Sequence, residues 1–534
     1  MSLKRPLSLP FDPIFLAILV AAAFLLFFRL DHRPFWQDEA ETACLARNVL
    51  KYGVPKAFDG VNLISQEQGR EFDADYLWRW SPWLQIYVAA GAFQMGGLTT
   101  TAGRFPFALA GLACIWLVYL LAKRRFGDLT WARLAAGLLA STVLFLLFSR
   151  QCRYYSIGAL LALVILYAFR GDWQSRFGPA ALLVGSLVLL FHTNYLLFFS
   201  YAVPLLVASV LLYRRELPLR RTLILALVTA LLVIPSLKLY RFGQQAGMMD
   251  FTLVPNNLGL YFTDLFQFML PLPVAAGLLW RWRNFFLGRA GPPDKPEERF
   301  TLFLGLIILG NIAIMALVPQ RFFRYVFHLY PLCALILAWV IRQVWRYHKF
   351  SGILLALLLV LTNFLHLVPM GWLGIVNRPD HNHIFMLTYP NIPLKLLVTE
   401  LGYGYPDTNR SLIQFFKTQA RPGETILATY GDLPLQFYTS YRVLGGLQGS
   451  ISPRESPDWV AKRRITRLNR QGLFLEAEEF IRHHLRLKED YRQEVLPYPD
   501  ERFGNIPEPG YHRFLAPGEP FPHLTIHRQG PEVP

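Results

Sequence analysis

Three carboxylates lie within four positions directly after the first long apolar stretch of the chain: Asp38, Glu39 and Glu41. Acidic side chains near a membrane surface are costly without a partner or a task, because lipid headgroups and a low dielectric both disfavour the anion. An ionised carboxylate at a buried interface can act as a general base on an incoming hydroxyl. The same residues also suit the first turn of a helix running through Leu45 and Leu50, where anions complement the helix dipole. Both interpretations stay open at this point.

Two other segments combine arginine with tyrosine at the ends of apolar stretches. A guanidinium group can bind a phosphate through two parallel hydrogen bonds. In the topology derived below, both segments lie on the outer side of a membrane, where few arginines are expected, so a bound anion would explain them. The alternative is that these side chains only extend to the membrane interface. The candidates for binding a donor phosphate are Arg150, Arg153, Tyr154, Arg321, Arg324 and Tyr325.

Arg104, His192 and Glu41 are further candidates for substrate contacts at the same boundary. A lone histidine between two spans is more often a hydrogen-bonding partner of a neighbouring helix, so His192 keeps that alternative. No metal site is predicted, because the run Asp380–His383 has no third ligand and is better explained as a polar loop. The four cysteines also lack the spacing of a zinc site. A divalent metal cofactor is left open.

The composition indicates a membrane protein with many spans. Of the 534 residues 54% are hydrophobic, the mean hydropathy is +0.31, and long apolar blocks recur up to about residue 368. The first block, Pro13–Phe28, follows Lys4 and Arg5 as in a signal peptide. No small-residue cleavage site follows it, so we expect a retained first span.

The net charge is +17, but the distribution of the basic residues indicates a membrane topology and not a nucleic-acid partner. Clusters of Lys and Arg alternate with loops that are poorer in them, as the positive-inside rule predicts. The pattern predicts about eleven transmembrane helices in the plasma (inner) membrane, with the N-terminus cytoplasmic and the C-terminus periplasmic or extracellular. The expected spans are 12–30, 104–122, 131–149, 155–169, 179–191, 195–213, 222–240, 257–280, 301–319, 325–342 and 350–368.

Residues 31–103 form the first outer loop, which is rich in tryptophan and large enough to build a site. The apolar piece Trp83–Met95 is short for a crossing and would invert most later loops if it were a span. We therefore expect a juxtamembrane helix that lies in the interface. The segment Trp78–Trp83 before it predicts an aromatic belt.

The composition changes after residue 369, where proline, glycine, charge and turn signals increase. Residues 1–369 are thus predicted to form a transmembrane catalytic domain, and residues 370–534 a small extracytoplasmic α/β domain. Within the second domain the pattern predicts a helix at Ser411–Thr418, a strand at Thr425–Thr429 and an amphipathic helix at Ala477–Glu489.

Four motifs together resemble those of the polyprenyl-phosphate-sugar-dependent glycosyltransferases of the GT-C fold, specifically the protein O-mannosyltransferase and lipid A aminoarabinose transferase group. The motifs are Asp38-Glu39, Gly103-Arg104-Phe105-Pro106, Lys123-Arg124-Arg125-Phe126-Gly127 and Ser149-Arg150-Gln151-Cys152-Arg153-Tyr154-Tyr155. The resemblance covers roughly residues 10–370. It implies an inverting transferase that moves a sugar from a polyprenyl phosphate in the membrane to a hydroxyl of a lipid, glycan or protein outside the cytoplasm.

By motif position, the resemblance implies that Asp38 is the catalytic base and Glu39 an essential acidic neighbour. Arg321, Arg324 and Tyr325 match more loosely the residues that hold the carrier phosphate. The chain has Trp80-Ser81-Pro82 where relatives often carry His-Pro-Pro, so the acceptor side differs. A lipid-borne donor needs no glycine-rich phosphate loop, and none is present.

Two other classes of function share some of these features. A transporter or flippase of a polyprenyl-linked glycan would also use outer arginines and apolar grooves, but it commonly shows paired halves, which we do not find. An anchoring protein whose tail binds a partner would leave the carboxylates and the two arginine segments unexplained.

Overall fold

The computed structural model describes residues 12–169, 177–243, 250–376, 387–404, 407–463, 475–500, 506–509, 511–514 and 522–530. Up to residue 376 these residues are almost entirely helical. The elements of this part are α1 Pro13–Phe27, α2 Gln37–Tyr52, α3 Leu84–Gly96, α4 Thr100–Phe126, α5 Leu129–Ser141, α6 Val143–Ser149, α7 Tyr155–Phe169, α8 Phe177–Thr193, α9 Tyr195–Tyr213, α10 Leu219–Leu239, η1 Phe251–Leu253, α12 Val254–Phe268, α13 Leu272–Arg281, α14 Arg283–Phe286, α15 Pro296–Met315, η2 Phe323–Leu329, α16 Tyr330–Tyr347, α17 Lys349–Leu361 and α18 Phe364–Trp372.

The helices identify an integral membrane protein. Among the described residues, five helices are long and apolar enough to cross a bilayer, or up to eight if each of three bent pairs forms one span. Every predicted span coincides with a helix or with a bent pair, while the count of eleven crossings stays a prediction.

Three of the predicted spans are not single straight helices. The pairs α5/α6, α12/α13 and α17/α18 bend by 66°, 106° and 91°. At the second break, Pro271 has no N–H group to continue the hydrogen-bond ladder. Hydropathy finds apolar residues but does not report such a break, so the sequence predicted continuous spans.

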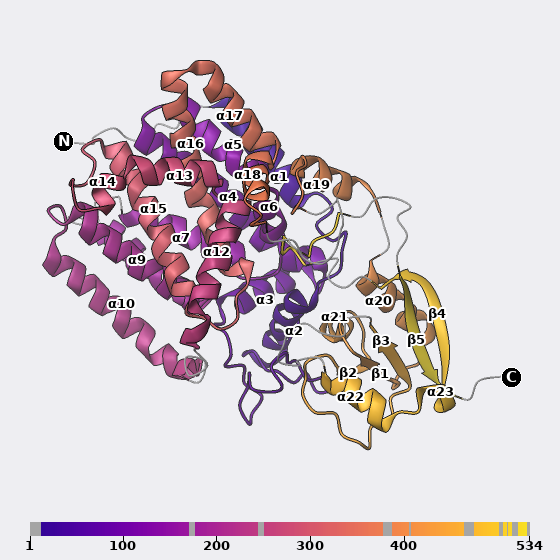
Figure 1. Ribbon diagram of the computed structural model, residues 1–534. Coiled ribbons are helices and arrows are strands. Elements are labelled where there is room, and N and C mark those ends of the chain that lie inside the picture. The colour runs from indigo at the N-terminus through magenta and orange to yellow at the C-terminus, as the bar shows by residue number, and fades with distance from the viewer. Residues whose placement is uncertain are drawn as a thin grey trace.

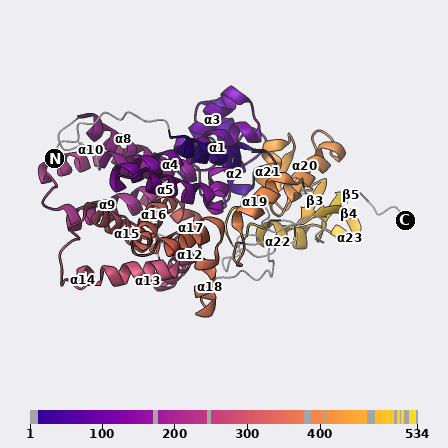
Figure 2. The same ribbon diagram turned by 90° about the horizontal axis from the view of Figure 1, so that it is seen from above.

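The carboxy-terminal part contains a five-stranded sheet beside the helical part (Figures 1 and 2). The strand order is β2-β1-β3-β5-β4, in which β1 is parallel to β2 and β3, and β5 is antiparallel to β3 and β4. Its elements are α19 Pro393–Gly402, α20 Thr408–Gln419, β1 Thr425–Ala428, α21 Asp432–Tyr438, β2 Arg442–Gly445, β3 Trp459–Lys462, α22 Leu475–His484, α23 Leu487–Asp490, β4 Tyr491–Pro499 and β5 His523–Gln529.

Helices cover both faces of this sheet. Ile426 and Ala428 of β1 pack towards α20, while Leu427 between them packs towards α22. Both faces are therefore apolar, as expected for parallel strands with helices on either side. The predicted helix Ala477–Glu489 is divided into α22 and α23, because Arg486 between them has non-helical dihedral angles (φ −94°, ψ 73°).

The first outer loop packs against both parts of the molecule. Its core contains Trp78, which is fully buried and donates a hydrogen bond from its indole N–H to Ser81 Oγ at 3.0 Å. Trp78 is thus part of a protein core, which corrects the expectation of a membrane-facing belt at this position. The same core takes in Leu433 and Phe437 of α21 and joins the loop to the carboxy-terminal part.

Gly111 allows α4 to approach α6 closely. A Cβ atom at Gly111 would lie 2.6 Å from Ser149 Cβ, at the start of the segment that carries the predicted phosphate-binding residues. We expect Gly111→Ala to destabilise the protein by about 1–3 kcal/mol through overpacking. Thermal unfolding in detergent measures this effect. Gly137→Ala is the matched control, because its Cβ would meet no atom closer than 4.0 Å; equal melting temperatures of the two variants would contradict the prediction.

Candidate active site

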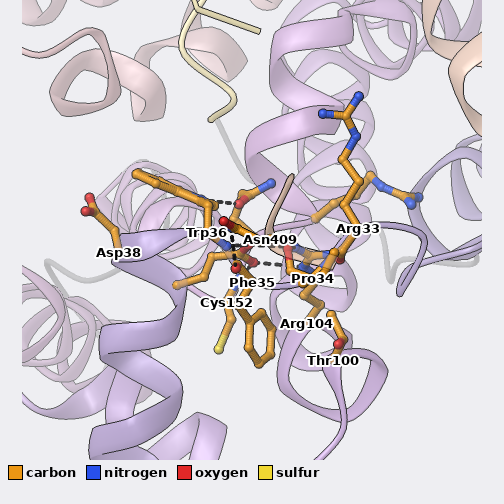
Figure 3. Close-up of polar contacts among 12 residues, drawn as sticks. Arg33, Pro34, Phe35, Trp36, Asp38, Thr100, Arg104, Cys152 and Asn409 are labelled. Carbon is orange, nitrogen blue, oxygen red and sulfur yellow. Dashed lines mark hydrogen bonds and ion pairs between the residues drawn. The ribbon is translucent and has the colours of Figure 1, made fainter. Parts of the chain in front are cut away.

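The three clustered carboxylates lie in the first turns of α2, which begins at Gln37. The helical interpretation of this segment is therefore confirmed, and it does not compete with a role in catalysis. A helix start fixes the direction of each side chain, so neighbouring carboxylates point to different surroundings. Figure 3 shows Asp38 directed away from Arg104 and Cys152.

Glu39 is held from three directions and is 0% exposed. Arg104 donates to both of its oxygens, from Nε to Oε1 at 2.8 Å and from Nη2 to Oε2 at 2.6 Å. The backbone N–H of Cys152 donates to Oε1 at 2.8 Å, and that of Trp36 donates to Oε2 at 3.4 Å. A carboxylate with this set of partners is well suited to fix α2 against α4 and the Arg153 segment.

Asp38 has a very different environment. Its side chain keeps some exposure, with 8% of the residue accessible. Its Oδ2 lies 3.4 Å from Arg324 Nη2 and 3.8 Å from Arg153 Nη2. Within the described part of the chain, no hydrogen bond to its carboxylate is found. Asp38 is thus a largely buried carboxylate that lies between two guanidinium groups.

Arg153 is oriented by a second carboxylate of α2. Its Nη1 donates to Glu41 Oε1 at 2.6 Å and to Thr42 Oγ1 at 3.0 Å. Glu41 in turn accepts from Gln66 Nε2 at 2.7 Å. Glu41 thus holds the arginine that faces Asp38.

Arg324 brings a third segment to the same place. Its guanidinium lies over the Phe322 ring, 3.9 Å from the centroid, and its Nη1 lies 3.6 Å from Glu508 Oε1. Tyr325 is within electrostatic range of Asp38, Arg153 and Arg324. Segments that are far apart in sequence thus meet at Asp38.

Two tyrosines beside this cluster have unsatisfied hydroxyl groups. Tyr154 and Tyr155 are buried, and neither hydroxyl has a hydrogen-bond partner among the described residues. Neither hydroxyl is therefore used by a contact between described residues. Tyr155 lies within electrostatic range of Asp38 and Arg324. The phosphate site predicted from sequence included Tyr154 but not Tyr155.

The structure gives two of the predicted arginines other contacts. All five N–H groups of Arg104 are used by Glu39 and by the carbonyls of Leu30, Arg33 and Pro34. Arg104 therefore has no N–H group left for a phosphate. Arg150 donates four hydrogen bonds to carbonyls at the end of α1, those of Leu25, Leu26, Phe28 and Arg29. Both arginines thus donate hydrogen bonds to backbone carbonyls at the end of α1 or in the segment that follows it.

Two further candidates lie outside the cluster. Arg321 pairs with Asp264 of α12 and also donates to the Leu260 carbonyl at 3.5 Å, so part of its charge is neutralised there. His192 lies 3.1 Å from the Tyr240 hydroxyl through Nδ1, which corresponds to the interhelical alternative. Neither residue has a recorded contact with Asp38.

The carboxy-terminal part fixes the start of α2. Gln37 Nε2 donates to Asp432 Oδ1 at 2.7 Å, at the start of α21. The backbone N–H of Phe35 donates to the Tyr438 hydroxyl at 3.0 Å. Burial raises the pKa of Asp432 to about 6. The carboxy-terminal part thus contributes directly to the position of Asp38.

Three other residues near the cluster carry no clear signal in the sequence. Burial, with a smaller effect of Glu71, raises the pKa of Glu67 to about 7. Burial also raises the pKa of Tyr430, which lies within electrostatic range of Asp38, and the pKa of Glu508.

The described residues contain no group of three or more His, Cys, Asp or Glu side chains arranged to hold a metal ion. The run Asp380–His383 lies outside the described residues.

The family described as dolichyl-phosphate-mannose-protein mannosyltransferase matches residues 81–238. This range includes Arg104 and Arg153 but not Asp38. No curated protein matches the chain by sequence.

Several solved structures resemble the whole fold. ArnT from Cupriavidus metallidurans in the apo state is 13% identical, with a TM-score of 0.55 over 96% of this chain and 97% of that one. ArnT bound to undecaprenyl phosphate is 15% identical, with a TM-score of 0.54 over 81% and 85%. The oligosaccharyltransferase of Archaeoglobus fulgidus in complex with zinc and sulfate is 14% identical, with a TM-score of 0.50 over 91% and 72%. At these identities the likeness concerns the fold alone. The chain has a GT-C fold similar to that of ArnT and resembles the protein mannosyltransferases, as its motifs predicted.

Proposed function

We propose that the protein is an inverting glycosyltransferase that moves a sugar from a polyprenyl-phosphate carrier to a hydroxyl of a lipid, glycan or protein. The observation that carries this proposal is the contrast between two adjacent carboxylates. Glu39 is fully used by structural contacts, whereas Asp38 stands between two arginines. One available base beside clustered cations is what this reaction requires.

In the proposed reaction Asp38 removes the proton of the acceptor hydroxyl. The acceptor oxygen forms a bond to the anomeric carbon from the face opposite the phosphate, and the bond between that carbon and the phosphate oxygen breaks. The electron pair stays on the phosphate. Arg153 and Arg324 neutralise the developing charge, so the leaving group needs no proton from an acid.

The remaining residues of the cluster support these groups. Glu39 and Arg104 position the first turn of α2, and Glu41 orients Arg153. The hydroxyls of Tyr154 and Tyr155, which have no partner within the described ranges, are available to donate to phosphate oxygens. Tyr325 lies within electrostatic range of Asp38, Arg153 and Arg324.

We further propose the orientation that the basic loops favour. The N-terminus faces the cytoplasm, residues 1–369 form the transmembrane catalytic domain, and residues 370–534 form an extracytoplasmic domain on the outer face. The contacts of α21 with α2 support a carboxy-terminal domain next to the site. None of these observations favours the transporter alternative.

The stereochemistry of the product tests the proposed mechanism. A single displacement inverts the anomeric configuration, so a donor of known configuration should give the opposite one in the product. NMR of the isolated glycoside measures it. Retention of configuration would contradict a single displacement assisted by Asp38.

Arg324→Ala is expected to weaken donor binding about ten- to hundredfold, because hydrogen bonds to charged groups contribute about 1.5–3 kcal/mol. Equilibrium binding of a polyprenyl-phosphate sugar to the purified protein measures the change. Arg70→Ala in the first outer loop is the control, because Arg70 is exposed and its side chain donates a hydrogen bond only to Gln68 among the described residues. Unchanged donor affinity in Arg324→Ala would show that Arg324 serves only to anchor its segment.

A further inference from the structure

A short segment of the tail between β4 and β5 reaches back to the membrane helices. Ile506 packs on Trp36, directly before α2. His512 Nε2 lies 2.8 Å from Glu400 Oε2, and Phe514 is buried in the core of the transmembrane helices. The segment is therefore held at both ends, and Glu508 lies between these contacts.

Glu508 shares a guanidinium group with Asp38. It is 6% exposed, and its Oε1 lies 3.6 Å from Arg324 Nη1 and accepts from the Arg324 backbone N–H at 3.4 Å. The other side of the same guanidinium lies 3.4 Å from Asp38 Oδ2. These distances are longer than those of a tight charge-assisted pair, about 2.7–2.9 Å. Arg324 is thus held loosely between two carboxylates.

A phosphate on Arg324 would meet this second carboxylate. The guanidinium carries five N–H groups, and its Nη1 faces Glu508 while its Nη2 faces Asp38. Two anions close together in a buried site disfavour each other's charged form. The ionised form of Glu508 therefore competes with any phosphate bound there, and because burial raises the pKa of this carboxyl, the competition increases as the pH rises.

The competition affects the product more than the donor. The donor is a phosphodiester with one negative charge. Transfer breaks the bond between the anomeric carbon and the phosphate oxygen, and the carrier leaves as a phosphate monoester. A monoester has a second pKa near about 6 and carries close to two charges at neutral pH. Repulsion from a fixed carboxylate is therefore greater for the spent carrier.

We infer that Glu508 competes with the carrier phosphate for Arg324 and so promotes release of the polyprenyl phosphate product. This inference rests on the proposed function. It assigns to a residue of the carboxy-terminal part a specific role in turnover, separate from acceptor binding and from the deprotonation step.

Equilibrium binding of polyprenyl phosphate to the full-length protein in nanodiscs tests the inference. Glu508→Gln keeps the shape of the side chain and removes its charge, so affinity for polyprenyl phosphate should rise about tenfold, and affinity for the donor should rise less. Glu508→Asp keeps the charge and should bind more nearly like the wild type. Glu494→Gln, on the exposed side of β4, is the control and should not change.

The outcomes separate the inference from the proposed function. If the wild type binds neither polyprenyl phosphate nor the donor, the proposed function fails. If the wild type binds both and Glu508→Gln binds the product no more tightly, only the role of Glu508 fails. An equal rise in affinity for polyprenyl phosphate in Glu508→Asp and Glu508→Gln would also overturn the role of Glu508, because the effect would then come from a lost contact and not from the lost charge.

Discussion

Asp38→Asn is expected to lower turnover by about 10²-fold or more, the usual scale for removing a general base. The amide has nearly the shape of the carboxylate but cannot accept a proton at neutral pH. Asp38 has no hydrogen bond to its carboxylate within the described residues, so the substitution breaks few structural contacts. The rate of sugar transfer at saturating donor measures the change.

The control for this prediction is Asp75→Asn. Asp75 is an exposed residue of the same outer loop and undergoes the same chemical change. Its turnover should match the wild type, and both variants should keep the melting temperature of the wild type. Near-normal turnover in Asp38→Asn would show that Asp38 is not the general base.

Arg104→Ala is expected to destabilise the protein by roughly 3–5 kcal/mol, the scale for removing one partner of a buried ion pair. The substitution leaves Glu39 buried without its counter-charge, and it also removes donors from three backbone carbonyls. Because Glu39 fixes α2, we expect loss of the folded protein and not a selective loss of turnover. Thermal unfolding in detergent measures the effect.

Arg442→Ala provides a matched control for the effect of burial. Arg442 also donates to both oxygens of a carboxylate, that of Glu455, but the two side chains are 44% and 25% exposed. An exposed pair contributes about 0–1 kcal/mol, so its loss should hardly move the melting temperature. Similar shifts in the two variants would contradict the structural role of the Arg104–Glu39 pair.

Much of the helical part could be predicted from the sequence, because a bilayer requires long apolar helices and the basic loops mark their ends. The predicted spans 104–122 and 195–213 correspond to α4 and α9. The bends could not be predicted. They depend on how neighbouring helices pack around a break, as at Pro271, and hydropathy averages over such positions.

The site was predictable at the level of segments but not of single side chains. Asp38, Arg153 and Arg324 were expected at one boundary, and the structure brings them together. Arg104 and Arg150 have the same residue type at the same boundary, yet their N–H groups bond to backbone carbonyls. The sequence does not report which carbonyls lack a partner, so it could not separate these two arginines from the others.

Residues that reach the site from other parts of the chain had the weakest signal. Tyr155 belongs to a recognised motif, but no feature of the sequence distinguishes it from Tyr154 as a phosphate-binding residue. Glu508 lies in an irregular tail segment, without periodicity or a motif that would connect it with Arg324. Only the contacts of the folded chain identify it.

The measurement that tests the central claim most directly is sugar transfer by the purified wild-type protein in nanodiscs. A panel of radiolabelled polyprenyl-phosphate sugars is offered together with a membrane lipid extract, a glycan fraction and a protein fraction. The proposed function predicts that label moves from at least one carrier to an acceptor, with release of polyprenyl phosphate. Binding of the labelled lipids without transfer from any of them would contradict a glycosyltransferase and support a transporter of the same ligands.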